Sequence, residues 1–254
     1  MGHAFLPQPL FVTEIRTENH STKTVELAGS LEAVPGQFVM AWLPGIDEKP
    51  FSLAKADPLQ LTIAAVGPFS QAVHRLKVGD RLWVRGPLGQ GFRLPSGEKV
   101  GQKLLLVGGG YGVAPLHFLA EQALAAGHQP GMIIGARDRA NLLLTAAFEA
   151  LDIPLWLTTE DGSAGQSGLV TDAIVDIFIE PQTRPDIVYA CGPTGMLAAV
   201  AKLCQVEAIP FQLAWEAHMR CAMGLCGSCE VGAGWLTCLD GPVFAFDPLA
   251  EAPV

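Results

Sequence analysis

The sequence is poor in charge: only 16% of its 254 residues are Asp, Glu, Lys or Arg, whereas about 25% is usual in a globular protein. Acidic residues outnumber basic ones by 25 to 16, and no basic run occurs. Such a chain binds nucleic acid and anionic membranes poorly, so we expect no nucleic-acid partner. Half of the residues are hydrophobic, which excludes a disordered chain. The scarcity of charge also predicts that a partner covers part of the surface.

The sequence also lacks an uninterrupted apolar run of membrane-spanning length. The longest run, 104–120, contains four glycines and a proline, which argues against a membrane span. Pro7 and Pro9 stand where a signal peptide would need a continuous apolar core. We therefore predict a cytoplasmic protein, in which six cysteines are not expected to form disulfides. Their spacing then indicates either ligand chemistry or simple burial.

Hydrolytic motifs are missing as well. The sequence contains neither a G-x-S-x-G elbow nor an H-E-x-x-H zinc motif. Its isolated histidines, His74, His117 and His218, form no catalytic pair with carboxylates at helical spacing. The chemistry is therefore expected to depend on glycine-rich turns and cysteines.

The first 95 residues or so consist of short β-rich runs separated by Gly and Pro turns, a pattern typical of a small antiparallel barrel. A short helix is expected over 71–77. The expected strands are 10–17, 24–28, 37–43, 59–66 and 81–85.

After a linker at 94–98, apolar strands alternate with helices, which predicts a parallel sheet covered on both faces. The expected strands are 103–107, 132–136, 155–158, 187–190 and 211–215, and the expected helices are 114–126, 142–151, 169–179 and 194–207. The last 40 residues or so follow neither the two-residue period of a strand nor the 3.6-residue period of a helix. We therefore expect an N-terminal antiparallel β-barrel (1–97), a Rossmann-like α/β nucleotide-binding domain (98–212) and a small C-terminal loop lobe (213–254).

The C-terminal loop carries four cysteines in the pattern C-x4-C-x2-C-x8-C: Cys221, Cys226, Cys229 and Cys238. The first three match the plant-type [2Fe–2S] spacing, in which a fourth cysteine lies further on. Gly224 and Gly227 would let the loop fold back and bring amide N–H groups to the sulfurs. Zinc is the main alternative, but a four-cysteine zinc ribbon normally has two C-x2-C knuckles and this loop has one. The spacing favours iron–sulfur over zinc, and both over four unrelated buried cysteines.

Two glycine-containing segments follow predicted strands. The turn from Gly108 to Pro115 lies between a strand and a helix, where a diphosphate binds at a helix N-terminus. It departs from G-x-G-x-x-G, because proline replaces the last glycine. Cys191 to Thr194 lies at another strand end, where α/β sheets bind ligands. Either segment can also serve packing alone.

The barrel half contains a cation, a hydroxyl and aromatic rings close together. Lys49 to Ser52 and Val66 to Ser70 supply them. These groups suit a flavin with a phosphate tail, although such segments are often ordinary strand ends.

Taken in order, these segments resemble the ferredoxin–NADP reductase superfamily with a ferredoxin-like cluster lobe appended. The matching segments are Pro35 to Phe38 at the barrel entry, Lys49 to Ser52 for the flavin motif R-P-[FYI]-S, Gly108 to Pro115 for the nicotinamide loop, and Cys191 to Pro193 for the C-G-P strand end. Within the superfamily, three further segments resemble the electron-transfer subunits of class 1B dihydroorotate dehydrogenase: 159–163 with 168–171, 216–219 with Cys221, and 238–244.

The resemblance implies a set of binding residues. FAD would be held in the barrel by Lys49, Pro50, Phe51, Ser52, Ala65, Val66, Gly67, Phe69 and Ser70. The nicotinamide nucleotide would be held by Gly108, Gly109, Gly110, Gly112, Pro115, Arg137, Cys191, Gly192, Pro193 and Thr194. Ser52 and Cys191 are the implied catalytic residues, and the four cysteines of the C-terminal loop are the implied [2Fe–2S] ligands. Lys49 replaces the usual arginine, which keeps the charge and loses bidentate phosphate recognition.

The resemblance also implies an electron relay in pyrimidine biosynthesis. Nicotinamide moves two electrons together and a cluster moves one, so a flavin must lie between them. The implied partner is an FMN-containing catalytic subunit that oxidises dihydroorotate, in a heterotetramer with two copies of each chain. Two alternatives remain: the small subunit of an electron-bifurcating transhydrogenase or sulfur reductase, and a regulatory iron–sulfur sensor without FAD. The segment from Arg137 to Arg139 does not decide between NAD and NADP, because an arginine there could pair with a 2′-phosphate and Asp138 could bind the ribose hydroxyls. The resemblance to the family favours NAD.

Overall fold

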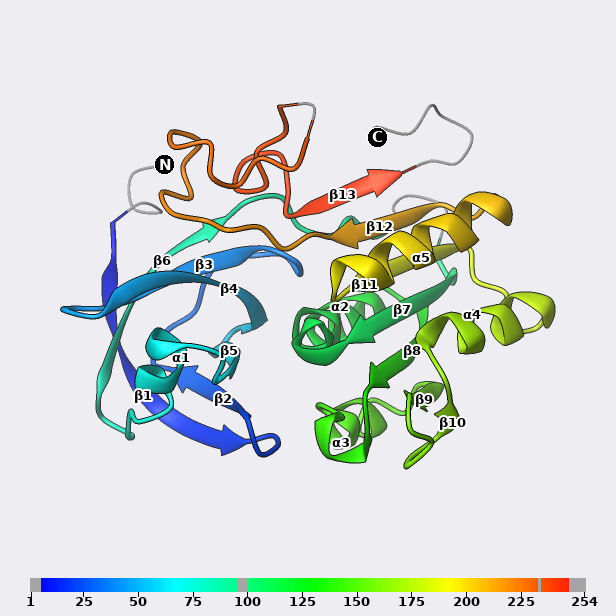
Figure 1. Ribbon diagram of the computed structural model, residues 1–254, viewed down its shortest axis with the longest axis horizontal. Coiled ribbons are helices and arrows are strands. Elements are labelled where there is room, and N and C mark those ends of the chain that lie inside the picture. Colours follow the sequence, from blue (N-terminus) through cyan, green and yellow to red (C-terminus); the bar gives the residue numbers. More distant parts are fainter. Residues whose placement is uncertain (1–5, 96–99, 233, 247–254) are drawn as a thin grey trace.

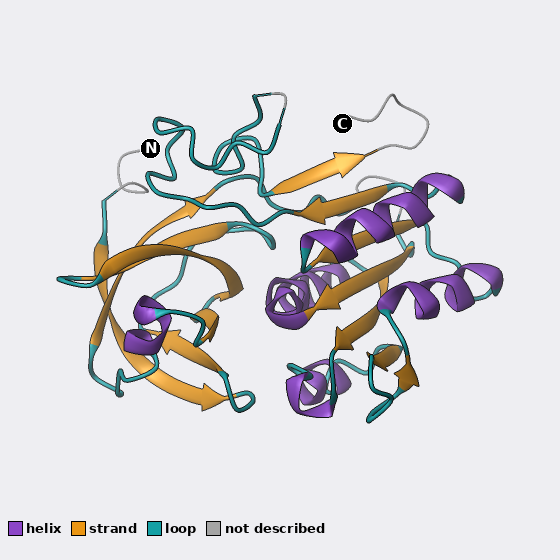
Figure 2. Ribbon diagram, in the orientation of Figure 1, coloured by secondary structure: helices purple, strands orange, loops and turns teal. Residues whose placement is uncertain are grey.

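Two β-structures lie side by side, and the C-terminal segment runs across the top of both (Figure 1). This computed structural model describes residues 6–95, 100–232 and 234–246. The N-terminal strands close into a barrel, whereas the later strands form an open sheet between helices (Figure 2). The expected fold class is confirmed in both halves.

The barrel has six antiparallel strands in the order β1-β2-β5-β4-β3-β6, with β6 pairing back onto β1. Its interior is filled by branched aliphatic side chains such as Leu53, Leu61 and Ile63, all fully buried. Along β3, Val39 and Ala41 join this core, while Phe38 and Met40 belong to a second apolar cluster with the C-terminal segment. The barrel strands are β1 (Gln8–Thr17), β2 (Thr22–Leu27), β3 (Phe38–Leu43), β4 (Asp47–Ala56), β5 (Leu59–Ala64) and β6 (Arg81–Leu88).

Two details of the barrel differ from the sequence prediction. The strand β4 was not expected as a strand, because Pro50 interrupts its pattern and proline is rare inside sheets. The short helix is α1 (Pro68–Val73), and the expected range 71–77 was wrong. Pro68 begins this helix because its fixed φ suits the first helical position, and the Ser70 hydroxyl accepts a hydrogen bond from the Gly67 N–H at 3.0 Å.

The open sheet has seven strands in the order β10-β9-β8-β7-β11-β12-β13, parallel except for the last pair. Leu104 and Leu106 of β7 face one helical layer, whereas Leu105 and Val107 face the other. The strands are β7 (Lys103–Gly109), β8 (Gln129–Ala136), β9 (Leu155–Thr159), β10 (Gln166–Ser167), β11 (Ile187–Cys191), β12 (Phe211–Ala214) and β13 (Val243–Phe246). The helices are α2 (Val113–Ala125) and α3 (Thr145–Glu149) on one face, and α4 (Val170–Ile179) and α5 (Thr194–Val206) on the other.

Helix α2 connects the two β-structures. Its Phe118 is 4% exposed and packs into the core of the barrel, and its Glu121 pairs with Lys55 of β4 at 3.7 Å. The turn that precedes α2 is therefore held at the junction between barrel and sheet.

The C-terminal segment is less separate than its irregular sequence predicts. The expected boundary between residues 212 and 213 falls inside β12, and β13, which was not expected, returns to the same sheet. The expected helix over 142–151 is confined to α3 after a 3₁₀ turn, η2 (Arg139–Asn141). The expected boundary between residues 97 and 98 lies outside the described residues. Within the ranges that the structure describes, no helix is long and apolar enough to cross a membrane.

Candidate functional site

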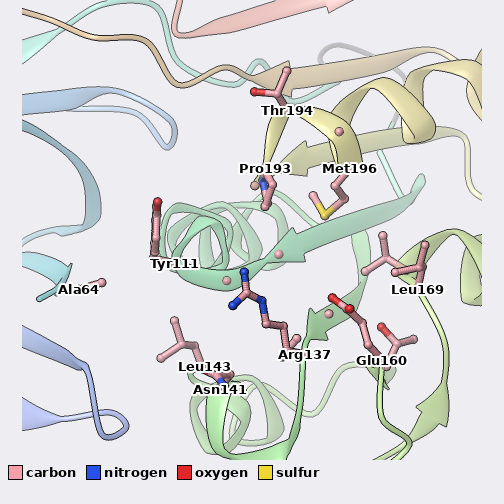
Figure 3. A pocket seen from close by; sticks show the side chains of 18 of the residues that line it. Ala64, Tyr111, Arg137, Asn141, Leu143, Glu160, Leu169, Pro193, Thr194 and Met196 are labelled. Atoms are coloured by element: carbon pink, nitrogen blue, oxygen red, sulfur yellow. The ribbon is translucent and has the colours of Figure 1, made fainter. Parts of the chain in front are cut away.

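Two adjoining cavities lie where the carboxyl ends of the sheet strands face the barrel. The first, of about 890 Å³, is bounded by the ends of β7, β8, β9 and β11 (Figure 3). The second, of about 600 Å³, lies between the barrel and the start of α2. Tyr111, Glu216, Ala64 and Val66 line both cavities. Groups bound in the two cavities would therefore lie next to each other.

Most of the residues expected at the site line one of these cavities. Gly109, Gly110, Arg137, Gly192, Pro193 and Thr194 line the first. Lys49, Pro50, Phe51, Ser52, Gly67, Phe69, Ser70, Gly112, Pro115 and Cys191 line the second. Ala65 and Gly108 are not among the lining residues of either. The Ala65 N–H donates to the Ser21 carbonyl at 2.8 Å, and Gly108 is packed so closely that a Cβ would lie 2.8 Å from Met132.

The glycine-rich turn and the strand end at Cys191 are in direct contact. A Cβ on Gly112 would overlap the backbone carbonyl of Cys191, and the backbone cannot yield as a flexible side chain can. The absence of a side chain at this position lets α2 begin against β11. The contact also explains why residues of the expected nucleotide loop line both cavities: the loop forms the wall between them.

Burial and the Glu216 carboxylate shift the pKa values of the groups at this wall. Burial raises the pKa of the Glu216 carboxyl above its ordinary range. The Glu216 carboxylate, followed by burial, raises the pKa of Tyr111. Burial raises the pKa of the Cys191 thiol to about 12, with a smaller contribution from Glu216, so this thiol is neutral at physiological pH. The junction thus presents a phenol, a carboxyl group and an uncharged thiol.

Sequence reasoning assigned no role to Tyr111 or Glu216. Glu216 follows β12, just as the Cys191 segment follows β11, and the carboxyl ends of parallel strands are where such sheets bind ligands. The position of Glu216 just after a predicted parallel strand was therefore the signal in the sequence that could have identified it.

Arg137 and Glu160 enter the first cavity from neighbouring strand ends (Figure 3). Asp138 is occupied locally, because its carboxylate accepts hydrogen bonds from the Asn141 backbone N–H at 3.0 Å and from the Asn141 side chain. The Arg139 Nε donates to the Ser163 carbonyl at 3.0 Å. Of the three residues considered for nucleotide choice, only Arg137 lines the cavity, and the nearby carboxylate comes from Glu160 instead.

Lys49 lies at the rim of the second cavity as part of an ion pair. Its Nζ lies 2.7 Å from Asp47 Oδ2, and the lysine side chain is 40% exposed. The hydrogen bond from Lys49 is the main reason that the pKa of Asp47 is lowered. A phosphate at this position would have to share the lysine with Asp47.

The four loop cysteines occupy one compact segment on the outer face of the barrel. The sulfurs of Cys229 and Cys238, both buried, are 3.3 Å apart. The Leu225 N–H points to the sulfur of Cys221 at 3.4 Å, and Cys226 is exposed. Gly224 and Gly227 have φ values of 77° and 70°, in the left-handed region that allows the tight reversal. Among the described residues, no three Cys, His, Asp or Glu side chains already surround one point as ligands of a single metal ion would.

This cysteine segment, residues 217–239, leads directly away from the second cavity. Ala217, His218 and Met219 line that cavity, and Met219, Ala222, Cys229 and Cys238 pack against Phe38, Met40 and Leu88 of the barrel. Soft thiol donors, a nearby backbone N–H and an apolar support fit an iron–sulfur cluster. A cluster held here would be close to the second cavity.

A closed antiparallel barrel joined through α2 to a nucleotide-binding sheet defines a ferredoxin reductase-like oxidoreductase. A solved structure of an NADH-dependent reduced ferredoxin–NADP oxidoreductase, described in connection with flavin-based electron bifurcation, matches with a TM-score of 0.79 and 30% identity, covering 96% of this chain and 90% of that one. Residues 106–202 match the oxidoreductase NAD-binding domain. Residues 216–250 match the iron–sulfur cluster binding domain of dihydroorotate dehydrogenase B, which favours iron–sulfur over zinc.

Curated relatives identify the family more narrowly. A protein of Thermococcus kodakarensis named as a probable dihydroorotate dehydrogenase B (NAD(+)) electron transfer subunit is 41% identical, covering 94% of this chain and 96% of the relative. A protein of the same name from Methanopyrus kandleri is 39% identical over 94% of this chain and 90% of its own length. The chain belongs to the family of dihydroorotate dehydrogenase B electron transfer subunits.

Proposed function

We propose that the chain transfers electrons between NAD(H) and a dihydroorotate dehydrogenase catalytic subunit, using FAD and a [2Fe–2S] cluster. The observation that carries this proposal is the order of the three candidate sites. The first cavity meets the second at Tyr111 and Glu216, and the cysteine segment starts in the wall of the second. A route from nucleotide to flavin to cluster follows from this order.

Within this proposal the second cavity holds FAD. Phe51 and Phe69 lie stacked with ring centroids 5.9 Å apart, and with Ser52 they supply the aromatic and hydroxyl groups that would hold the flavin. Lys49 and the segment from Gly67 to Ser70 would hold its phosphates. FAD, when bound, would supply the chemistry that exchanges a hydride with nicotinamide and single electrons with a cluster.

The first cavity is the proposed site of the nicotinamide nucleotide. The backbone of Gly109 and Gly110 and the start of α5 at Pro193 and Thr194 would hold the diphosphate. The carboxylate of Glu160 suits ribose hydroxyls, which supports NAD as the substrate. Arg137, on the neighbouring strand end, would lie beside the same part of the nucleotide.

Residues at the junction would control the approach of the two groups. The neutral, buried thiol of Cys191 and the hydroxyl of Ser52 add no charge to the space where a hydride would move. Glu216 reaches both cavities and is the only carboxylate among the lining residues they share. We assign Ser52, Cys191 and Glu216 to positioning the reacting rings and excluding water.

The proposed partner is an FMN-containing catalytic subunit, in a cytoplasmic heterotetramer with two copies of each chain. Large apolar side chains are exposed on the cysteine segment, which supports a partner at this surface. They are Met223, Leu225, Val231, Trp235 and Leu239.

A bifurcating reductase subunit has support from the structural match at 30% identity. The curated relatives at 39–41% identity carry the dihydroorotate dehydrogenase name, which favours the first function. A sensor without FAD would have no use for the second cavity.

Reconstitution tests the proposal. The purified chain, loaded with FAD and cluster, would be mixed with the catalytic subunit from the same source, and NAD⁺ reduction by dihydroorotate would be followed at 340 nm. We expect turnover only when both subunits are present. A catalytic subunit that is active with an artificial acceptor, binds this chain and still reduces no NAD⁺ would refute the proposed function.

A further inference from the structure

A buried cation lies beneath the cysteine segment. Arg85 of β6 is only 5% exposed and lies next to Met40 of β3 in the barrel wall. Its Nε and Nη2 donate to the two carboxylate oxygens of Glu48 at 2.6 and 2.9 Å. Its Nη2 also donates to the backbone carbonyl of Cys221 at 3.0 Å. A single guanidinium therefore joins two barrel strands to a cysteine of the segment.

The third nitrogen of the guanidinium, Nη1, has no hydrogen-bond partner among the described residues, although that atom is fully buried. An unsatisfied donor on a buried cation is costly, and a buried ion pair is not an efficient way to stabilise a fold. The surroundings are apolar, since Met40, Leu88, Met219 and Ala222 pack in the same interface. Packing alone does not explain an arginine here.

We propose that Arg85 is a positioning residue for the cluster that also raises its reduction potential. This inference rests on the proposed role of the four cysteines as cluster ligands. By holding the Cys221 carbonyl, Arg85 fixes the start of the ligand loop on the rigid barrel. It also places the positive end of the Arg85–Glu48 pair next to the ligand set.

The direction in which Arg85 shifts the reduction potential of the cluster follows from the charges at the site. Four thiolates make a negative site, and reduction adds another negative charge. A fixed cation stabilises the reduced form more than the oxidised form, and hydrogen bonds and net charge are known to set cluster potentials. Glu48 opposes this effect because it neutralises Arg85. Removing the cation should therefore lower the potential, and removing the carboxylate charge should raise it.

The experiment is an EPR-monitored redox titration of the cluster in the intact, FAD-loaded chain, with iron and sulfide content measured in parallel. For Arg85→Met we expect the equilibrium constant for reduction to fall about tenfold, which is about 59 mV for a one-electron couple. For Glu48→Gln we expect a shift of similar size in the opposite direction. Arg85→Lys should keep the potential near wild type but lose iron faster, because lysine has no bidentate fork.

Arg81 provides the matched control. It lies on the same strand but is exposed and stacks over Phe11 at 4.9 Å, so Arg81→Met should leave the potential unchanged. The inference is overturned if Arg85→Met and Glu48→Gln shift the potential in the same direction, or if neither shifts it. If Arg85→Met holds no cluster, Glu48→Gln decides: an upward shift supports the inference and an unchanged potential overturns it. Wild-type protein without iron would refute the cluster itself, and the inference with it.

Discussion

At the scale of single residues, the junction of the two cavities contains groups whose pKa values are set by burial and, for Tyr111, mainly by a neighbouring carboxylate. Tyr111 and Glu216 come from distant parts of the chain, yet the carboxylate is the main cause of the raised pKa of the phenol. Their coupling can be measured directly, because the chain has only two tyrosines.

Glu216→Gln should lower the pKa of Tyr111. The carboxylate disfavours the phenolate, so its removal leaves burial and the smaller contribution of Cys191 to raise the pKa of Tyr111, which should fall while staying above 10.0, its ordinary value. The measurement is a pH titration of ¹³C-labelled tyrosine by NMR on the oxidised protein. Tyr189 is the internal control: it is buried, its hydroxyl donates to the Arg93 carbonyl at 3.0 Å, and burial alone raises its pKa. An unchanged Tyr111 titration would show that the two side chains do not interact.

Some residues of the candidate site could be predicted from the sequence, and others could not. The four cysteines were predicted as cluster ligands from their spacing within one short loop, without tertiary information, and their role as ligands stays a prediction. Arg85 and Glu216 make contacts with elements far along the chain. No local pattern distinguishes Arg85 from an ordinary surface residue, and the signals for Glu216 are its place just after a predicted parallel strand and in the segment 216–219. Ala65 shows the opposite limit, since it lies between two lining residues in the sequence but lines neither cavity itself.

At the scale of elements, the contact between α2 and β11 decides the shape of the site. Gly112 is in an ordinary helical conformation, with φ −62°. Glycine is therefore needed at this position because there is no room for a side chain, and not because of the backbone conformation. Gly112→Ala should force the start of α2 away from Cys191, because a Cβ there would overlap backbone atoms. We expect a loss of about 1–3 kcal/mol in the free energy of unfolding, typical of an overpacked site, together with faster FAD loss.

Gly195→Ala is the matched control for Gly112→Ala. Gly195 lies in the first turn of α5, and a Cβ there would meet no heavy atom within 4 Å. The melting temperature of the Gly195→Ala variant should match that of the wild-type protein. Differential scanning calorimetry and flavin fluorescence on both variants test the claim, and equal stability of the two would mean that the close approach is not needed.

Elements with a strong apolar pattern were predicted well, and those fixed by their neighbours were not. The parallel strands β7, β8 and β11 each contain a short apolar run, as expected for strands that are buried on both faces of the sheet. In contrast, β4 contains Pro50, and β13 is a short strand that exists because β12 offers it an edge. Helix α3 is short because η2 and a left-handed Leu144, with φ 55°, precede it.

At the scale of the whole molecule, the three candidate sites form one path, and its order makes a kinetic prediction. Cys226→Ser should disrupt the cluster, because serine is a harder and less acidic ligand than cysteine. Reduction of the flavin by NADH, measured by rapid mixing, should persist, because none of the four loop cysteines lines either cavity. Electron exchange with the catalytic subunit should fall by orders of magnitude.

Two checks make this test decisive. Size-exclusion chromatography must show that the variant still binds the catalytic subunit, because the exposed apolar side chains lie on the same segment. Cys204→Ala controls for cysteine loss, since Cys204 lies on α5 and is buried in the apolar cluster between the helices and the sheet. A Cys226→Ser complex that couples dihydroorotate to NAD⁺ at the wild-type rate would mean that the cluster is structural.

The pairing of β12 with β13 has a further consequence. The chain leaves the sheet at Ala214, passes through the cysteine segment and returns to the sheet at Val243. Ala214 and Val243 are opposite each other in the strand register. The Trp215 N–H donates to the Pro242 carbonyl at 2.8 Å, so the excursion starts and ends at one place. The entropic cost of closing such a loop rises by only about 0.6 kcal/mol for each doubling of its length. Insertions and deletions between Cys229 and Cys238 can therefore accumulate during evolution at little cost to the sheet, so the face offered to a partner can diversify while the nucleotide cavities keep their shape.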